Sequence, residues 1–68
     1  MDTVFNQIYK ENKQILIKYV SNTFTEKDKD NLIMNCCKYN VDYNNFIDWF
    51  KLSKNIELDM ELLYHFRY

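Results

Sequence analysis

Residues 44–52, NNFIDWFKL, hold the single Trp of the chain and its densest run of apolar side chains. The apolar residues in and just before this segment stand at positions i, i+3, i+4 and i+7: Tyr43, Phe46, Ile47 and Phe50. This spacing puts four side chains on one face of a helix. Trp49 falls about 60° outside that face, since a helix advances roughly 100° per residue. We therefore expect Trp49 at the rim of the core or in contact with another molecule.

The first 21 residues also show the helical period. Their apolar residues recur at intervals that fit 3.6 residues per turn: Val4, Phe5, Ile8, Ile15, Leu16, Tyr19 and Val20. Asp2 or Thr3 can cap this helix, and the polar residues Glu11 and Asn12 interrupt its apolar stripe. The helix either runs unbroken over residues 3–21 or divides near Asn12, and both alternatives stay open.

A second helix is predicted to begin at one of two capping boxes. Thr23 and Glu26 have the required spacing, and Thr25 with Asp28 forms a weaker version further along the chain. Residues 27–30 alternate in charge and are expected to form a solvated first turn. The buried stripe of this helix is predicted to consist of Leu32, Ile33, Cys36 and Cys37.

Asn and Asp mark the remaining helix boundaries. Asn40, in the left-handed conformation, is predicted to end the second helix, and Asp42 to cap the central one, which ends near Ser53. Residues 54–58 are interpreted as a connector, and Asp59 as the cap of a last helix with an inner face of Leu62, Leu63 and Phe66. The predicted core comprises Leu32, Ile33, Cys36, Phe46, Ile47, Phe50, Leu62 and Leu63.

The composition favours a small helical domain. The 68 residues include no Gly and no Pro, which removes the usual hairpin turns and helix stops. Hydrophobic residues make up 47% of the chain and aromatic residues 18%, enough apolar area for a globular core. We predict one all-α domain over residues 1–68, with four or five short helices arranged as a helix-pair repeat or as a small bundle.

Charge and hydropathy limit where the protein is expected to reside and which classes of partner it is expected to bind. The net charge is −1 and no basic patch is visible, whereas nucleic-acid binders concentrate Lys and Arg. No segment approaches the roughly 18 apolar residues of a membrane span, and the first residues do not form a signal peptide. We expect a soluble intracellular protein, cytoplasmic or in the cytoplasm of a host cell, that does not contact a membrane.

The sequence carries no pattern of metal ligands, cofactor-binding groups or catalytic residues. Cys36 and Cys37 are adjacent, so a disulfide between them would need distorted backbone, and we interpret both as reduced core residues. The single His, His65, lies far from them and has no nucleophile placed near it. We predict no catalytic, cofactor or metal site, and a protein that is not an enzyme.

The chain resembles itself at an offset of about 30 residues. Residues 3–12 match residues 31–40 at an offset of 28, and residues 61–68 continue this series at an offset of 30. Residues 16–20 match residues 46–50, again at an offset of 30. The pattern indicates two helix pairs followed by the first helix of a third.

Helix pairs that recur near every 30 residues are typical of helical solenoids. A helix that ends in residues 36–40, CCKYN, before an outer helix that ends in residues 47–50, IDWF, resembles degenerate ankyrin repeats of the kind found in large DNA viruses. The Thr-Pro-Leu-His turn of that family is absent, and Asn40 stands where the family has Gly. The resemblance implies stacked helix pairs and a viral protein.

Aromatic residues on the predicted surface indicate an interaction site. Trp49, Tyr64 and Tyr68 are the predicted partner-binding residues, because Trp and Tyr are enriched at interface hot spots. The leading hypothesis is a non-enzymatic module for protein–protein interaction or assembly, which binds another protein or a second copy of itself. The alternative interpretation of these rings is that they complete a small core.

A second hypothesis is nucleic-acid binding by the first helix. Its lysines and neighbouring tyrosines could contact phosphates and stack on bases: Lys10, Lys13, Lys18, Tyr9 and Tyr19. Glu11 lies among them, and the net charge is of the wrong sign. These two features place this hypothesis second.

Overall fold

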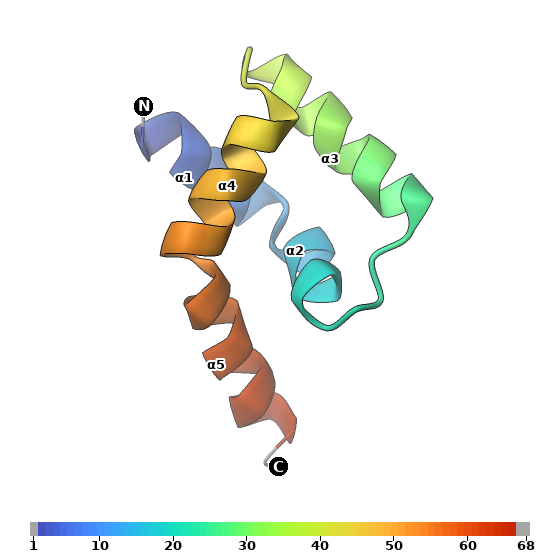
Figure 1. Cartoon of the computed structure of the whole chain (residues 1–68), viewed down its shortest axis with the longest axis vertical. Coiled ribbons are helices and arrows are strands. Elements are labelled where there is room, and N and C mark those ends of the chain that lie inside the picture. Colours follow the sequence, from blue (N-terminus) through green and yellow to red (C-terminus); the bar gives the residue numbers. More distant parts are fainter. Residues whose placement is uncertain (1, 67–68) are drawn as a thin grey trace.

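Five α-helices make up the fold (Figure 1). In this computed structural model, residues 2–66 are described, with side chains from Thr3 to Tyr64. The helices are α1 (Asp2–Glu11), α2 (Lys13–Val20), α3 (Glu26–Lys38), α4 (Tyr43–Ser53) and α5 (Asn55–Phe66). No strand occurs between residues 2 and 66, so the prediction of an all-α fold with four or five helices is confirmed.

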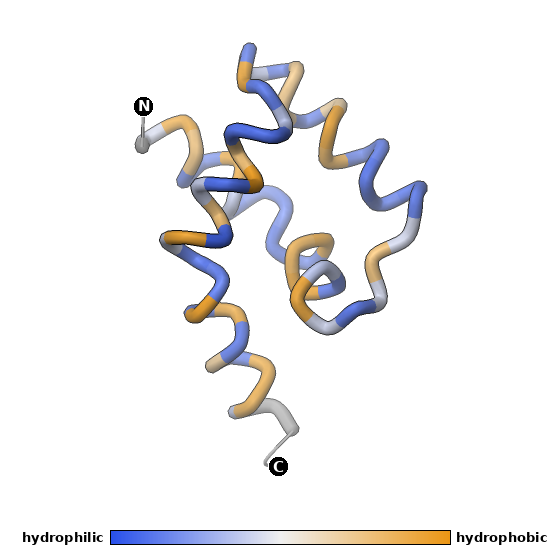
Figure 2. Tube along the Cα trace, in the orientation of Figure 1, coloured by the Kyte–Doolittle hydropathy of each residue, from blue (hydrophilic) through white to orange (hydrophobic). Residues whose placement is uncertain are grey.

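All five helices contribute buried residues to the core, and orange apolar residues recur along each of them (Figure 2). Its buried apolar residues are Ile8, Tyr9, Leu16, Leu32, Cys36, Phe46, Ile47, Phe50 and Leu58. Of the predicted core residues, Ile33 and Leu62 are only half-buried. Leu63 is 63% exposed, so its assignment to the core was wrong.

The last helix begins earlier than predicted, and this shift moves its buried face. α5 starts at Asn55, so the interpretation of residues 54–58 as a connector was wrong. Leu58 is wholly buried, and α5 packs on α2 and α4. Leu63 lies five residues after Leu58, which on a helix is about 140° around the axis. Leu63 therefore turns away from the face that Leu58 buries.

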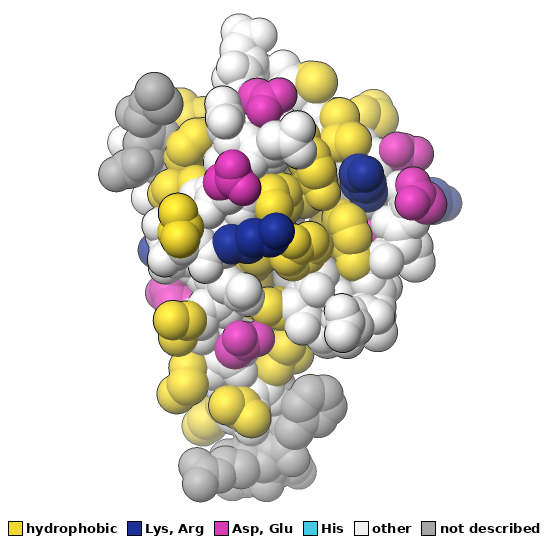
Figure 3. Space-filling view, viewed as in Figure 1, with side chains coloured by type: hydrophobic (Ala, Val, Ile, Leu, Met, Phe, Trp, Pro, Cys, Tyr) yellow, Lys and Arg dark blue, Asp and Glu magenta, His cyan; other side chains and the backbone are white. Residues whose placement is uncertain are grey.

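The molecule is more elongated than a compact domain with the same number of residues. Its radius of gyration is 11.8 Å and its extents are 38 × 25 × 17 Å, against about 11 Å expected for the radius of gyration of 68 residues. The accessible surface of 5074 Å² also exceeds the roughly 4,700 Å² typical of this mass. α5 extends below the other helices, and hydrophobic side chains are visible along it (Figures 1 and 3).

The first helix divides at Asn12, which selects one of the two open alternatives. The Asn12 side chain is buried and its Nδ2 donates to the Ile8 carbonyl at 2.8 Å, in competition with the Asn12 backbone N–H at 3.0 Å. The Leu16 N–H still donates to the Asn12 carbonyl at 3.0 Å, so helical bonding crosses the junction. The result is a kink, which this competition for one carbonyl explains. The Asn12 Oδ1 accepts a hydrogen bond from the Asn35 amide, which ties the kink to α3.

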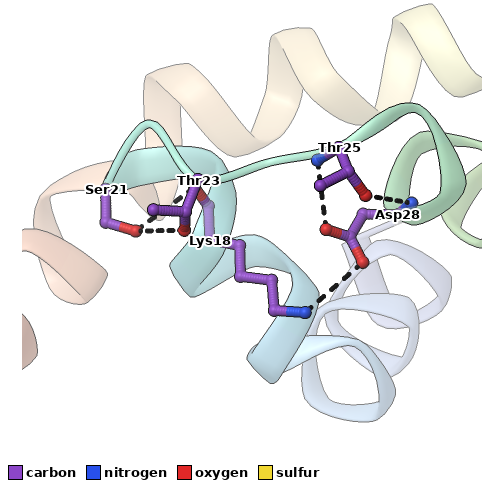
Figure 4. A network of polar contacts seen from close by, with 5 residues as sticks. All are labelled: Lys18, Ser21, Thr23, Thr25 and Asp28. Carbon is purple, nitrogen blue, oxygen red and sulfur yellow. Dashed lines mark hydrogen bonds and ion pairs between the residues drawn. The ribbon is translucent and has the colours of Figure 1, made fainter.

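The junction between α2 and α3 uses the second of the two predicted capping boxes (Figure 4). The Thr25 hydroxyl accepts from the Asp28 N–H, and the Asp28 carboxylate accepts from the Thr25 N–H, both at 3.1 Å. Thr23 is occupied elsewhere, because its N–H donates to the Lys18 carbonyl and closes the end of α2, with Asn22 at φ 63°. Asp28 is only 8% exposed, so its assignment to a solvated turn was wrong.

The junction between α3 and α4 follows the prediction. Asn40 adopts φ 57°, and the N–H groups of Asn40 and Val41 donate to the Cys37 and Cys36 carbonyls, the pattern of a Schellman motif. The Asp42 carboxylate then accepts from the Asn45 N–H at 3.2 Å and caps α4. The chain thus reverses here with Asn in place of Gly.

Candidate interaction face

Five large apolar side chains are exposed on the outer side of α4 and α5. Their exposed fractions are 87% for Leu52, 74% for Ile56, 61% for Met60, 63% for Leu63 and 66% for Tyr64. We call this group the outer apolar face. Hydrophobic atoms follow the edge of the molecule over the end of α4 and along α5 (Figure 3). Soluble monomers rarely expose contiguous apolar patches of more than a few hundred Å², so such a face needs an explanation.

The spacing of these residues makes them one stripe. Ile56, Met60 and Leu63 stand at i, i+4 and i+7 on α5, and Leu52 lies four residues before Ile56. The junction at Lys54 does not interrupt the helical path: the Lys54 N–H donates to the Phe50 carbonyl at 2.8 Å, and the Leu58 N–H to the Lys54 carbonyl at 3.3 Å. The sequence analysis missed this stripe because residues 54–58 were interpreted as a connector. A search for the same period across Leu52–Leu63 would have found it.

α5 is therefore apolar on two opposite sides. Leu58 lies about 200° around the axis from Ile56, and it is buried against the rest of the molecule. A helix in a small soluble domain normally needs only one apolar stripe, and a helix that is apolar all round is normally buried. Packing among the described residues accounts for the Leu58 side, and it leaves the side chains of Leu52, Ile56, Met60 and Leu63 exposed.

Carboxylates flank the outer apolar face on α5. Glu57 pairs with Lys54 at 3.0 Å, and Glu61 pairs with Lys13 at 2.8 Å. The hydrogen bond from Lys13 to Glu61 raises the pKa of the lysine. Asp59 is exposed, and no salt bridge to it occurs among the described residues. The part of α5 that has described side chains carries three acids and no Lys or Arg.

Trp49 lies at the edge of this face and packs inward. Its ring centroid is 5.3 Å from that of Phe5, 5.7 Å from that of Phe46 and 6.5 Å from that of Tyr9. The side chain is half-buried, and Leu52 follows it three residues later on α4. Trp49 therefore joins α1 to α4 and borders the outer apolar face.

The other two predicted partner-binding residues differ in how far the structure describes them. Tyr64 belongs to the outer apolar face. Tyr68 lies outside the described residues, as does the side chain of His65.

The residues of the second hypothesis do not form an open stacking surface. Tyr9 is buried in the core, and Tyr19 packs edge-on against Phe24 and Phe50 with ring centroids 5.2 and 5.9 Å apart. Lys13 is paired with Glu61, and Lys18 is paired with Asp28 at 3.5 Å. Lys10 is exposed. This arrangement presents neither flat rings nor a concentration of unpaired cations.

The two cysteines occupy different environments. Both are free; Cys36 is buried, and burial raises its pKa to about 11, which keeps it an unreactive thiol at neutral pH. Cys37 is exposed, so its assignment to the core was wrong. No group of three His, Cys, Asp or Glu suited to a metal ion occurs among the described residues.

Surface depressions also occur among the described residues. One of about 230 Å³ is lined by Phe5, Asn40, Val41, Asp42 and Asn45, and another, of about 410 Å³, by Tyr19, Asn22 and Phe24. Asp42 caps α4, and Tyr19 and Phe24 pack on each other, so these groups serve the fold.

Comparison with family models, curated proteins and solved structures finds no match to this chain. None of the described helices is long and apolar enough to cross a membrane. The function is therefore argued from the surface.

Proposed function

We propose that this chain is a non-enzymatic interaction module that binds another protein through the outer apolar face. The observation that carries the proposal is the stripe of exposed apolar side chains from Leu52 to Tyr64, on a helix whose opposite side already supplies its packing. Trp49 borders the stripe and can extend the contact, although part of its ring stabilises α1 against α4.

The size of the face sets the strength expected of such a complex. Full burial of one large apolar side chain contributes about 1.5–3 kcal/mol, so five of them contribute on the order of 10 kcal/mol. Association itself costs about 4–15 kcal/mol in lost translational and rotational freedom. The two quantities are of similar size, so we expect reversible binding in the micromolar range, and no obligate complex.

The helix-pair repeat belongs to this proposal. Two residue pairs support it: Ile8 and Cys36, which match at an offset of 28, and Leu16 and Phe46, which match at an offset of 30, are all wholly buried. A degenerate ankyrin-like array in a viral protein, located in the cytoplasm of a host cell, would use its helices in this way.

Site-specific photo-crosslinking tests the proposed function. A benzoylphenylalanine placed at Ile56 or Met60 should give protein adducts in cells that contain the chain, and Leu63→Asp in the same chain should abolish them. The matched control is Met34 on α3, which is 69% exposed and lies outside the face, and adducts there should be absent. Equal adducts at Met34, or adducts that persist with Leu63→Asp, would contradict the proposal.

A further inference from the structure

We infer that the partner segment is an amphipathic α-helix whose apolar stripe is flanked by Lys or Arg, laid along the outer apolar face. This inference rests on the proposed function and specifies its partner.

The shape of the face suits a helix. From Leu52 to Leu63 the stripe covers eleven residue steps, roughly 16 Å at 1.5 Å per residue. It is built from side chains on successive helical turns of α4 and α5, which form the ridges that a second helix packs against. The helices of this chain already pack on one another in this way, as α3 does on α4 and α2 on α5.

A comparison with α3 shows that the apolar stripe is not a requirement of the helix itself. At the internal offset of 30, Ile56 corresponds to Glu26 and Met60 corresponds to Asp30. Both α3 residues are exposed, so these two positions are charged in α3 and apolar in α5, whereas Leu63 and Tyr64 correspond to the apolar residues Ile33 and Met34. α3 keeps its fold with charged residues at these two positions, so a helix at this place in the chain does not require the apolar side chains of Ile56 and Met60.

Charge selects among the possible occupants of the face. The residues that flank the stripe on α5 are Glu57, Asp59 and Glu61, and no Lys or Arg accompanies them on the part of α5 with described side chains. When two copies of α5 pack face to face, parallel or antiparallel, flank meets flank and carboxylates oppose carboxylates. The same carboxylates would be repelled by an anionic lipid surface. A partner helix whose apolar stripe is flanked by Lys or Arg would instead be attracted to these carboxylates.

The existing ion pairs leave these carboxylates available. The pairs Glu57–Lys54 and Glu61–Lys13 lie at the surface, with side chains 27–56% exposed, and ion pairs at the surface contribute little to stability. A partner cation can therefore share or replace Lys54 or Lys13 with little loss. Asp59 needs no such exchange, because no salt bridge to it occurs in the described part of the chain.

Two designed peptides test the inference on the full chain. The first is a helical peptide of about 18 residues with Leu along one stripe and Lys elsewhere, and the second carries Glu in place of each Lys. Fluorescence anisotropy should show that the Leu/Lys peptide binds about tenfold or more tightly than the Leu/Glu peptide, with an advantage that shrinks as salt is added. Asp59→Asn should weaken binding of the Leu/Lys peptide severalfold at low salt.

Matched variants locate the binding site. The double variant Ile56→Ser with Met60→Ser should lose binding of the Leu/Lys peptide, and Met34→Ser should keep it; circular dichroism verifies that each variant is folded. Undiminished binding to the double variant would place the peptide elsewhere and overturn the inference. Equal binding of both peptides at the outer apolar face would overturn the basic partner and leave the proposed function standing. A dimer in sedimentation that the double variant disperses would make a second copy the occupant and would also overturn the inference. Failure of the proposed function itself would appear separately, in the crosslinking at Ile56 and Met34.

Discussion

Helices α3 and α5 correspond to each other at the sequence offset of 30 residues, and they are held in different ways. α3 has a reciprocal capping box at its start, a left-handed Asn40 after its end, and two wholly buried apolar residues, Leu32 and Cys36. α5 follows directly from the turn residue Lys54, and Leu58 is its one wholly buried residue among those described. The difference shows that, within one molecule, one helix can be held mainly by packing and capping while another keeps one side exposed for contact with a partner. α3 stabilises the fold, and α5 presents a surface.

The largest effect is expected from Phe50→Ala, in α4, the helix on which both α3 and α5 pack. Phe50 is wholly buried, with its ring centroid 5.9 Å from Tyr19 and 6.3 Å from Tyr9. Truncation of a buried Phe costs about 3–5 kcal/mol. A domain of this length has roughly 0.05–0.15 kcal/mol of stability per residue, so this loss is most of the total. Thermal unfolding followed by circular dichroism should show α3 and α5 melting together at a much lower temperature; an unchanged melting temperature would place Phe50 outside the core.

A smaller and more selective effect separates the two sides of α5. Leu58→Ala should lower the free energy of unfolding by about 2–5 kcal/mol, because Leu58 is wholly buried. Leu63→Ala should change it by no more than about 0.5 kcal/mol, because this side chain is 63% exposed. Urea denaturation of the two variants measures both values. Equal losses would mean that α5 has a single packed side and that the outer apolar face is part of the core.

The smallest effect concerns the start of α3 and depends on pH. The backbone N–H of Thr25, assisted by the Thr25 hydroxyl and by Lys18, holds the pKa of Asp28 below its ordinary value of 3.8. A carboxyl whose pKa is lower in the folded state stabilises the fold above its unfolded pKa. This contribution is lost as the pH falls below 3.8 and through the folded pKa. The unfolding free energy of the Asp28→Asn variant should fall less than that of the unmodified chain below about pH 4, and parallel curves would refute the assignment.

Those parts of the fold that depend on neighbouring residues alone could be predicted from the sequence. Asn40 and Asp42 were placed correctly, because a left-handed residue and an N-cap have few alternatives in a chain that lacks Gly and Pro. The buried face of α4 followed from its period.

The remaining features depend on contacts between segments that lie far apart in the sequence. The choice of the Thr25–Asp28 box depends on Lys18, which reaches Asp28 from α2, and on the use of Thr23 to close α2. Leu63 could not be assigned to a side of α5 without the true start of the helix. Of the candidate site, Tyr64 was predicted, while Leu52, Ile56 and Met60 were not.

The attachment of α5 through Leu58 also determines how the backbone should exchange its amide hydrogens. Segments with few buried contacts open locally, at a lower free energy than global unfolding. Beyond Leu58, α5 has Leu62 half-buried and Leu63 and Tyr64 exposed, so its amides should exchange with deuterium ahead of those of α3. A partner that binds the outer apolar face stabilises the closed state by mass action and slows exchange in α5 before any other helix. The helix that carries the outer apolar face thereby becomes the one whose amides report most directly on binding.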